Sequence, residues 1–254
     1  MGQIMSPSAI ILLVVAPFVG SFLGLVIERL PVGETVVFGR SRCRSCDTTL
    51  GPLDLVPLLS WVASGGRCRH CHAALGWFHP GIELAAFGVA LWSVSVAPGW
   101  LAWASAGLGW TLLALAVIDQ RHMTLPDALN LPLIPAGLVV AALTPSGALA
   151  DHLAGAAAGA ASLGAVAWAY ERATGRDGLG LGDVKLFAAA GAWVGWLGLP
   201  SVLLIGAASG LAAACTLRWI KGSDGPSEPV AFGPYLALGL WITWLYGPVN
   251  VEWF

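Results

Sequence analysis

The chain has 254 residues, of which 57% are hydrophobic and only 10% are charged. Soluble globular domains carry about 25% charged residues, so this composition excludes an ordinary soluble domain and indicates a membrane protein. The net charge of −2 excludes a basic nucleic-acid-binding face, and we expect no nucleic-acid partner.

The first apolar run predicts a membrane-spanning helix at residues 8–27. Residues 1–8 contain no Lys or Arg, so the basic region that opens a cleavable signal peptide is missing. We therefore expect this helix to stay in the mature protein.

The polar segment that follows, residues 28–79, carries four of the five cysteines in two Cys-x-x-Cys pairs. Pairs at this separation supply four thiolates in tetrahedral reach and predict a structural Zn²⁺ site. Two disulfides are the alternative, which a reducing cytosol disfavours. The predicted zinc ligands are Cys43, Cys46, Cys68 and Cys71. Three nearby histidines could substitute as ligands but are expected to lie on the surface: His70, His72 and His79.

Seven further apolar stretches follow, and each is read as a membrane span. The predicted fold is therefore an all-α polytopic membrane protein with about eight transmembrane helices and a small cytoplasmic zinc module between the first two. We divide the chain into the first helix (1–27), the tetracysteine module (28–79) and a seven-helix membrane domain (80–254). The seven later stretches are roughly 81–97, 100–118, 128–143, 149–170, 184–198, 200–219 and 232–248.

The positions of the positive charges predict the orientation in the membrane. With eight spans and an external N-terminus, all twelve Lys and Arg residues fall on one side. Cytoplasmic loops collect Lys and Arg, so this side is expected to face the cytoplasm. These residues are Arg29, Arg40, Arg42, Arg44, Arg67, Arg69, Arg121, Arg172, Arg176, Lys185, Arg218 and Lys221.

Two aspartates are predicted to meet at the cytoplasmic mouth of the helices. Asp119 closes one predicted span, and Asp183 follows two glycines, Gly180 and Gly182, between two later spans. Two carboxylates brought close share a proton and can activate water, which is the chemistry of an aspartic protease. The glycines permit backbone conformations forbidden to other residues and leave room for a bound peptide. Asp127 is better explained as a helix N-cap or loop residue.

Two alternatives remain for these acidic residues. Asp183 could serve as a helix N-cap, with or without a catalytic role. A proton- or cation-coupled transporter uses carboxylates in similar places, although the uncharged predicted interior and outer loops disfavour a transport path. Glu83, at the start of the second span, is expected to be interfacial, with a supporting role possible.

Taken together, these motifs resemble the prepilin leader peptidase/N-methyltransferase family of type IV pilus and type II secretion systems. The resemblance runs along nearly the whole chain and includes a Gly-x-Gly-Asp motif of membrane aspartyl proteases. The segments that carry it are Gly20–Pro31, Ser41–Cys46, Asp54–Trp61, Gly66–Cys71, Asp119–Asp127, Gly180–Lys185 and Phe232–Tyr235.

This resemblance implies that Asp119 and Asp183 are the catalytic pair of an endopeptidase in the bacterial inner membrane, with the active site facing the cytoplasm. The substrates would be prepilins or pseudopilins, whose short basic leader ends in Gly. The resemblance also implies S-adenosylmethionine-dependent methylation of the new α-amino group, associated with the cytoplasmic module. Two departures lie near that module: Gly24 replaces a usual Asn, and His79-Pro80 replaces a usual Tyr-Pro.

Overall fold

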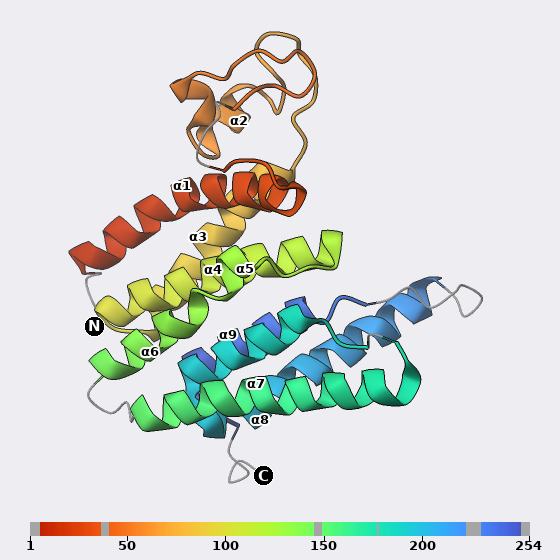
Figure 1. Cartoon of the computed structure of the whole chain (residues 1–254). Coiled ribbons are helices and arrows are strands. Elements are labelled where there is room, and N and C mark those ends of the chain that lie inside the picture. The colour runs from red at the N-terminus through yellow and green to blue at the C-terminus, as the bar shows by residue number, and fades with distance from the viewer. Residues whose placement is uncertain (1–5, 37–40, 145–148, 177, 222–229, 250–254) are drawn as a thin grey trace. The chain divides into compact units, whose positions relative to one another are not determined.

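The computed structural model describes residues 6–36, 41–144, 149–176, 178–221 and 230–249. Over these residues the chain is built from helices and contains no β-sheet, only two isolated β-bridges. The predicted all-α class is therefore confirmed (Figure 1). The chain divides into two compact units, Met1–Trp110 and Thr111–Phe254, and each is described separately.

The first unit pairs two long helices and carries the cysteine module between them. Its elements are α1 (Pro7–Arg29), η1 (Leu30–Val32), η2 (Pro52–Leu55), α2 (Leu59–Ala63) and α3 (Phe78–Val96). Ser6 starts α1 because its hydroxyl accepts a hydrogen bond from the Ala9 N–H over 3.3 Å. Helices α1 and α3 approach closely at Gly20, where a Cβ atom would lie 2.6 Å from the Cα of Glu83.

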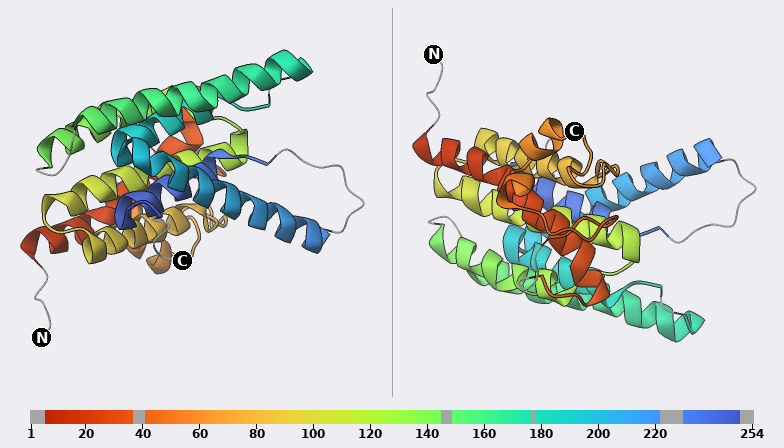
Figure 2. Two further views of the ribbon diagram at one scale, coloured as in Figure 1. Left: turned by 90° about the horizontal axis from the view of Figure 1, so that it is seen from below. Right: turned by 90° about the horizontal axis from the view of Figure 1, so that it is seen from above.

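Helix α4 (Trp100–His122) begins in the first unit and ends in the second. The other helices of the second unit are α5 (Asp127–Asn130), α6 (Leu133–Leu143), α7 (Leu149–Thr174), α8 (Leu181–Lys221) and α9 (Gly233–Tyr246). Helix α8 packs against α6, α7 and α9, as the two views of Figure 2 also show for α7. Gly155 and Gly159 let α7 approach the α8 backbone, because a Cβ on either would lie 2.5 Å from an α8 carbonyl oxygen.

Helix α8 is interrupted at Gly195, whose φ of 70° and ψ of 176° are not helical. Helices thus occupy parts of all eight stretches predicted to span the membrane. Among the described residues, however, only four helices are long and apolar enough to cross a membrane. The count of about eight spans is not confirmed and stays a prediction. The four are Pro7–Val32, Trp100–His122, Leu149–Thr174 and Leu181–Ile220.

Three fully buried side chains of the second unit lie close in sequence to Asp119, Asp183 and Gly233. Ile118, Leu186 and Leu236 are fully buried at 0% exposure. They lie in α4, α8 and α9, within three positions of Asp119, Asp183 and Gly233 respectively. Because packed apolar side chains tolerate little displacement, they hold these three helix ends in fixed positions.

Candidate active site and metal centre

Asp119 lies in the last turn of α4 and is only 6% exposed. Its Oδ2 accepts a hydrogen bond from the backbone N–H of Gly233, the first residue of α9, over 3.0 Å. A Cβ atom on Gly233 would lie 2.6 Å from the same oxygen, so a side chain there would displace the carboxylate. Gly233 is therefore required where α9 meets Asp119, a role that sequence analysis missed.

Asp183 is the third residue of α8. Its Oδ1 is buried and has no hydrogen-bond partner among the described residues. Gly180 is exposed, and a Cβ atom there would lie 3.4 Å from Asp183 Oδ2. A side chain at position 180 would thus lie in van der Waals contact with this oxygen. Asp183 also interacts electrostatically with Asp119.

Leu125 connects the surroundings of the two aspartates. Its Cδ1 lies 3.2 Å from the position of a Cβ atom on Gly233, beside Asp119. Its Cβ lies 2.8 Å from the corresponding position on Gly182, beside Asp183. The structure therefore brings Asp119 and Asp183, with Gly180 and Gly182, into one neighbourhood.

The reason for glycine at positions 180 and 182 differs from the one predicted. Neither residue has a positive φ, so the expectation of a backbone conformation forbidden to other residues is wrong. At Gly182 the constraint is space, because Leu125 occupies the volume that a side chain would need. At Gly180 a side chain would contact Asp183 Oδ2 without a clash.

Two further contacts hold the start of α8 and were not predicted. Asn130 is completely buried, and its Nδ2 donates a hydrogen bond to the Gly182 carbonyl oxygen over 2.8 Å. Its Oδ1 is buried without a partner among the described residues. The Nζ of Lys185 donates to both oxygens of Asp127, over 2.7 and 2.8 Å. An amide inside the apolar run 128–143 was the only sequence signal for Asn130.

Asp127 is not the N-cap that the sequence suggested. It is the first residue of α5, Pro126 occupies the cap position, and no side-chain cap hydrogen bond is present. The ion pair with Lys185 is half-exposed, so its contribution to stability is modest, about 0–1 kcal/mol. Asp127 therefore stabilises the contact between α5 and α8 through its ion pair with Lys185.

The neighbourhood of Asp119 and Asp183 has the features that two-carboxylate chemistry requires. Asp119 is buried and Asp183 is half-buried. One oxygen of Asp119 is fixed by a backbone N–H, and one oxygen of Asp183 is buried with no partner in the part of the chain that is described. Two neighbouring carboxylates can hold one proton between them, so that one acts as an acid and the other as a base.

In the first unit, the four predicted zinc ligands come together in one cluster. The Sγ atoms of Cys43, Cys46, Cys68 and Cys71 all lie within 4.8 Å of one another, and the Cys43–Cys71 separation is 3.8 Å. A tetrahedral Zn²⁺ with bonds of about 2.3 Å to sulfur requires sulfur separations of about 3.8 Å. The cluster therefore fits a tetrathiolate metal ion.

The two halves of the cluster repeat the same backbone structure. Cys43 N–H donates to the Thr48 oxygen and Cys68 N–H to the Ala73 oxygen, each over 2.9 Å. The residue after the second cysteine of each pair, Asp47 or His72, has a positive φ of 54° or 57°. An isolated β-bridge closes each loop: Arg42–Thr49 and Arg67–Ala74. Each of these residues in the first half corresponds to the residue 25 positions later in the second half. The module therefore contains two copies of one metal-binding loop.

Hydrogen bonding prepares two of these thiols to ionise. The side-chain hydrogen bond with Thr48, 3.3 Å from Sγ, lowers the pKa of Cys46 to about 6. Backbone N–H groups of Cys71 and His70 lower the pKa of Cys68. At Cys71 the Ala73 backbone N–H also favours the thiolate, but desolvation and the three neighbouring thiols outweigh it and raise the pKa to about 12. A bound cation would offset this repulsion between thiolates.

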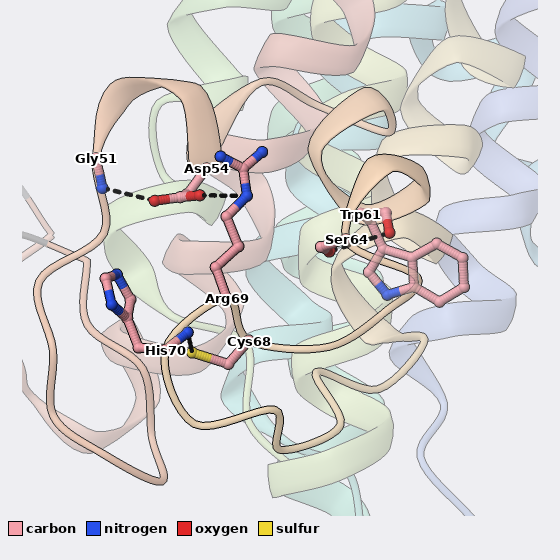
Figure 3. A network of polar contacts seen from close by, with 7 residues as sticks. All are labelled: Gly51, Asp54, Trp61, Ser64, Cys68, Arg69 and His70. Atoms are coloured by element: carbon pink, nitrogen blue, oxygen red, sulfur yellow. Dashed lines mark hydrogen bonds and ion pairs between the residues drawn. The ribbon is translucent and has the colours of Figure 1, made fainter.

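The loop between the two halves is tied to the second half by Asp54 (Figure 3). The Oδ2 of Asp54 accepts from the Gly51 N–H over 3.1 Å, and its Oδ1 lies 3.3 Å from Nε of Arg69. Arg69 lies between Cys68 and Cys71, so this carboxylate connects η2 to the second metal-binding loop.

Comparisons with known proteins agree with the sequence motifs. The model of the Bacterial Peptidase A24 N-terminal domain matches residues 14–96, and that of the Type IV leader peptidase family matches residues 106–215. No solved structure matches significantly.

Three relatives, each named "Prepilin leader peptidase/N-methyltransferase", show the extent of the similarity. The Aeromonas hydrophila protein is 37% identical over 93% of this chain and 90% of its own length. The Aeromonas salmonicida (strain A449) protein is 38% identical over 93% and 90%. The Stutzerimonas stutzeri protein is 35% identical over 95% and 92%.

Similarity of this extent does not favour the transporter alternative, because it covers both the module with the cysteine cluster and the unit with the aspartates. On these grounds the chain belongs to the type IV leader peptidase family.

Proposed function

We propose that this protein is a membrane aspartic endopeptidase that removes the basic leader from type IV prepilins or type II secretion pseudopilins. The observation that supports it most is the shared neighbourhood of Asp119 and Asp183, linked through Gly233, Leu125 and Gly182. The names of the relatives supply the substrate class.

In the proposed reaction, one aspartate is protonated and the other is ionised. The ionised carboxylate takes a proton from water while the water oxygen attacks the carbonyl carbon of the scissile peptide bond. The protonated carboxylic acid hydrogen-bonds to the carbonyl oxygen as it gains negative charge. When the C–N bond breaks, the carboxyl group that took the proton from water donates it to the leaving amine. The products are the leader acid and the new N-terminal amine, and the pair again holds one proton.

The fixed and the free oxygens suggest how the pair divides these tasks. Asp119, which accepts the Gly233 N–H, is favoured in its ionised form by that bond. We assign to Asp183 the side of the pair that faces the peptide, because its Oδ2 lies next to the exposed Gly180. We assign Gly180 and Gly182 to the substrate-binding surface.

We propose in addition that the protein methylates the amine that cleavage releases. S-adenosylmethionine supplies a methyl group from its sulfonium: an N–C bond forms, the C–S bond breaks, and S-adenosylhomocysteine and a proton leave. The relatives' names include N-methyltransferase, which supports this second activity. The cysteine module would hold Zn²⁺ as a structural ion, since four thiolates leave no open coordination position.

The site is proposed to act at the cytoplasmic face of the inner membrane. Four helices long and apolar enough to span a bilayer support a membrane location, and the Lys and Arg distribution supports the orientation. A substrate with a basic leader before an apolar helix would present its cleavage point at that interface.

Mass spectrometry of a processed substrate tests both activities in one measurement. Purified protein in detergent, given a prepilin and S-adenosylmethionine, is expected to yield a product shortened by its leader and heavier by one methyl group at the new N-terminus. A product that is cleaved but unmethylated would support the proposed protease activity and contradict the proposed methyltransferase activity. An uncut substrate would contradict the proposed hydrolysis.

A further inference from the structure

The first unit contains a cavity of about 550 Å³ lined by α1, the cysteine module and the start of α3. This volume lies within the range of about 300–1,000 Å³ that pockets for small molecules and cofactors occupy. Nothing in the peptidase chemistry of Asp119 and Asp183 uses it, because those residues belong to the second unit.

Acidic and basic groups of this cavity differ in their exposure. Three of its four carboxylates are sheltered: Glu83 is 6% exposed, and the side chains of Asp54 and Glu28 are 20% and 21% exposed. The fourth, Glu34, is exposed. Among the guanidinium groups, the side chains of Arg69 and Arg44 are 48% and 77% exposed, whereas Arg29 is half-buried. The most sheltered charged group of the cavity is therefore a carboxylate, that of Glu83.

Glu83 differs from the other two sheltered carboxylates because it has no countercharge among the described residues. Glu28 lies 2.6 Å from Arg44 and 3.4 Å from His79, and Asp54 is paired with Arg69. Across the described part of the chain, no Lys, Arg or His nitrogen lies within 4.0 Å of the Glu83 carboxylate. Its Oε2 accepts a hydrogen bond from the backbone N–H of Leu58, over 2.8 Å.

The position of Glu83 is fixed from two sides. Gly20 allows the α1 backbone to press against the Glu83 Cα. On the module side, Leu58 has φ 59° and ψ −50°, and the N–H of Leu59 donates to the Pro57 oxygen over 2.6 Å. This is a γ-turn with positive φ, which is rare and strained, and the hydrogen bond to Glu83 holds it. The carboxylate is therefore preorganised.

A buried carboxylate without a countercharge is costly unless a cation reaches it. Methyl transfer supplies such a cation, since S-adenosylmethionine carries positive charge on its sulfonium and on its α-ammonium group. We propose that this cavity is the binding site for the methyl donor and that Glu83 binds its cationic methionine end. This inference rests on the methyltransferase half of the proposed function.

The test compares two ligands on two variants of the full-length protein in detergent. S-adenosylmethionine carries the positive charges, and 5′-methylthioadenosine has the same adenosine and sulfur without them. Glu83→Gln removes the charge but keeps an oxygen that can accept the Leu58 N–H. Asp151→Asn removes an exposed carboxylate of α7 and serves as the matched control.

By isothermal titration calorimetry, Glu83→Gln is expected to weaken S-adenosylmethionine binding by about tenfold or more, as the loss of a charged hydrogen bond predicts. Its affinity for 5′-methylthioadenosine, its zinc content and its leader cleavage should match those of the wild type and of Asp151→Asn. Equal weakening of both ligands, or no weakening of either, would overturn the assignment. If the wild-type protein cleaves leaders but binds no S-adenosylmethionine, the proposed methyltransferase function is contradicted. The assignment of this cavity is then contradicted as well, whereas the proposed peptidase function stands.

Discussion

Asn130 donates a hydrogen bond from Nδ2 to the backbone oxygen of Gly182, although the two residues are 52 positions apart in the sequence. Asn130 is fully buried at the end of α5, and Gly182 immediately precedes Asp183. The side chain of one short helix thus fixes the backbone that carries a proposed catalytic carboxylate in another.

Replacing Asn130 by Ala should therefore reduce both stability and activity. The Gly182 carbonyl oxygen would lose its partner, which costs about 1–3 kcal/mol of unfolding free energy. A small displacement of Asp183 should lower the rate of leader cleavage by about tenfold to a hundredfold. Cleavage kinetics and thermal unfolding in detergent would measure the two effects. Thr216→Ala, which removes an exposed hydroxyl bonded within α8, is the matched control. Unchanged kinetics in Asn130→Ala would show that this bond does not position Asp183.

The contact between Gly233 and Asp119 predicts that a substitution at Gly233 lowers leader cleavage at least as strongly as one at Asn130. In Gly233→Ala the new Cβ would lie 2.6 Å from Asp119 Oδ2, so the carboxylate must move and lose its hydrogen bond from the backbone. We expect leader cleavage to fall by about a hundredfold, the scale of a misplaced acid–base group. Gly88→Ala adds the same methyl group on α3, where nothing lies within 4 Å, and should leave cleavage unchanged. Similar rates in the two variants would contradict this role of Gly233.

Gly24 should affect methylation without affecting cleavage. A Cβ on Gly24 would lie 2.6 Å from His79 Nδ1, and His79 Nε2 lies 3.4 Å from Glu28 on the wall of the cavity in the first unit. Gly24→Ala would push the imidazole away from Glu28, and we expect N-methylation to slow by about tenfold. Gly81→Ala, which meets no atom within 4 Å, is the control. Mass spectrometry of the processed substrate reports both activities, and equal methylation by the two variants would argue against a role for His79.

The cysteine cluster predicts about one Zn²⁺ per chain by elemental analysis of reduced protein. Cys68→Ser removes a ligand that is 2% exposed, so the metal should be lost and the module should become sensitive to proteolysis between residues 41 and 76. Cys215→Ser, which removes the exposed cysteine of α8, should keep the metal. A folded, reduced wild-type protein without metal would exclude the zinc site.

The metal cluster could be predicted because its ligands are close in sequence. Each Cys-x-x-Cys pair brings its own two thiols together, so the prediction required only that the two pairs lie close to each other. The structure confirms that they do. Asp119 and Asp183 are 64 residues apart, and their proximity was expected only from the predicted membrane topology and the family resemblance. The helical class followed from long apolar runs, whereas helix length was harder to predict: only four of the described helices are long and apolar enough to span a bilayer.

The supporting residues could not be predicted because their roles exist only after packing. A side chain at Gly233 would collide with Asp119 Oδ2 at the end of α4. A side chain at Gly182 would collide with Leu125. Asp127 has the pattern of an N-cap, yet tertiary contact with Lys185 decides its role. Glu83 gave a sequence signal as a charge at the start of an apolar helix, but its partner, the strained Leu58, lies 25 residues away in the module.

Substitution of the two aspartates tests the central claim most directly. Asp119→Asn and Asp183→Asn keep the shape of each side chain and remove its capacity to exchange a proton. Each should lower leader cleavage by at least about a hundredfold. The double variant should be hardly worse than either, because the two groups act as one unit. Asp127→Asn should retain most of the activity, and methylation of a substrate supplied without its leader should persist in all of these variants. Full leader cleavage by either Asp119→Asn or Asp183→Asn would contradict the proposed mechanism.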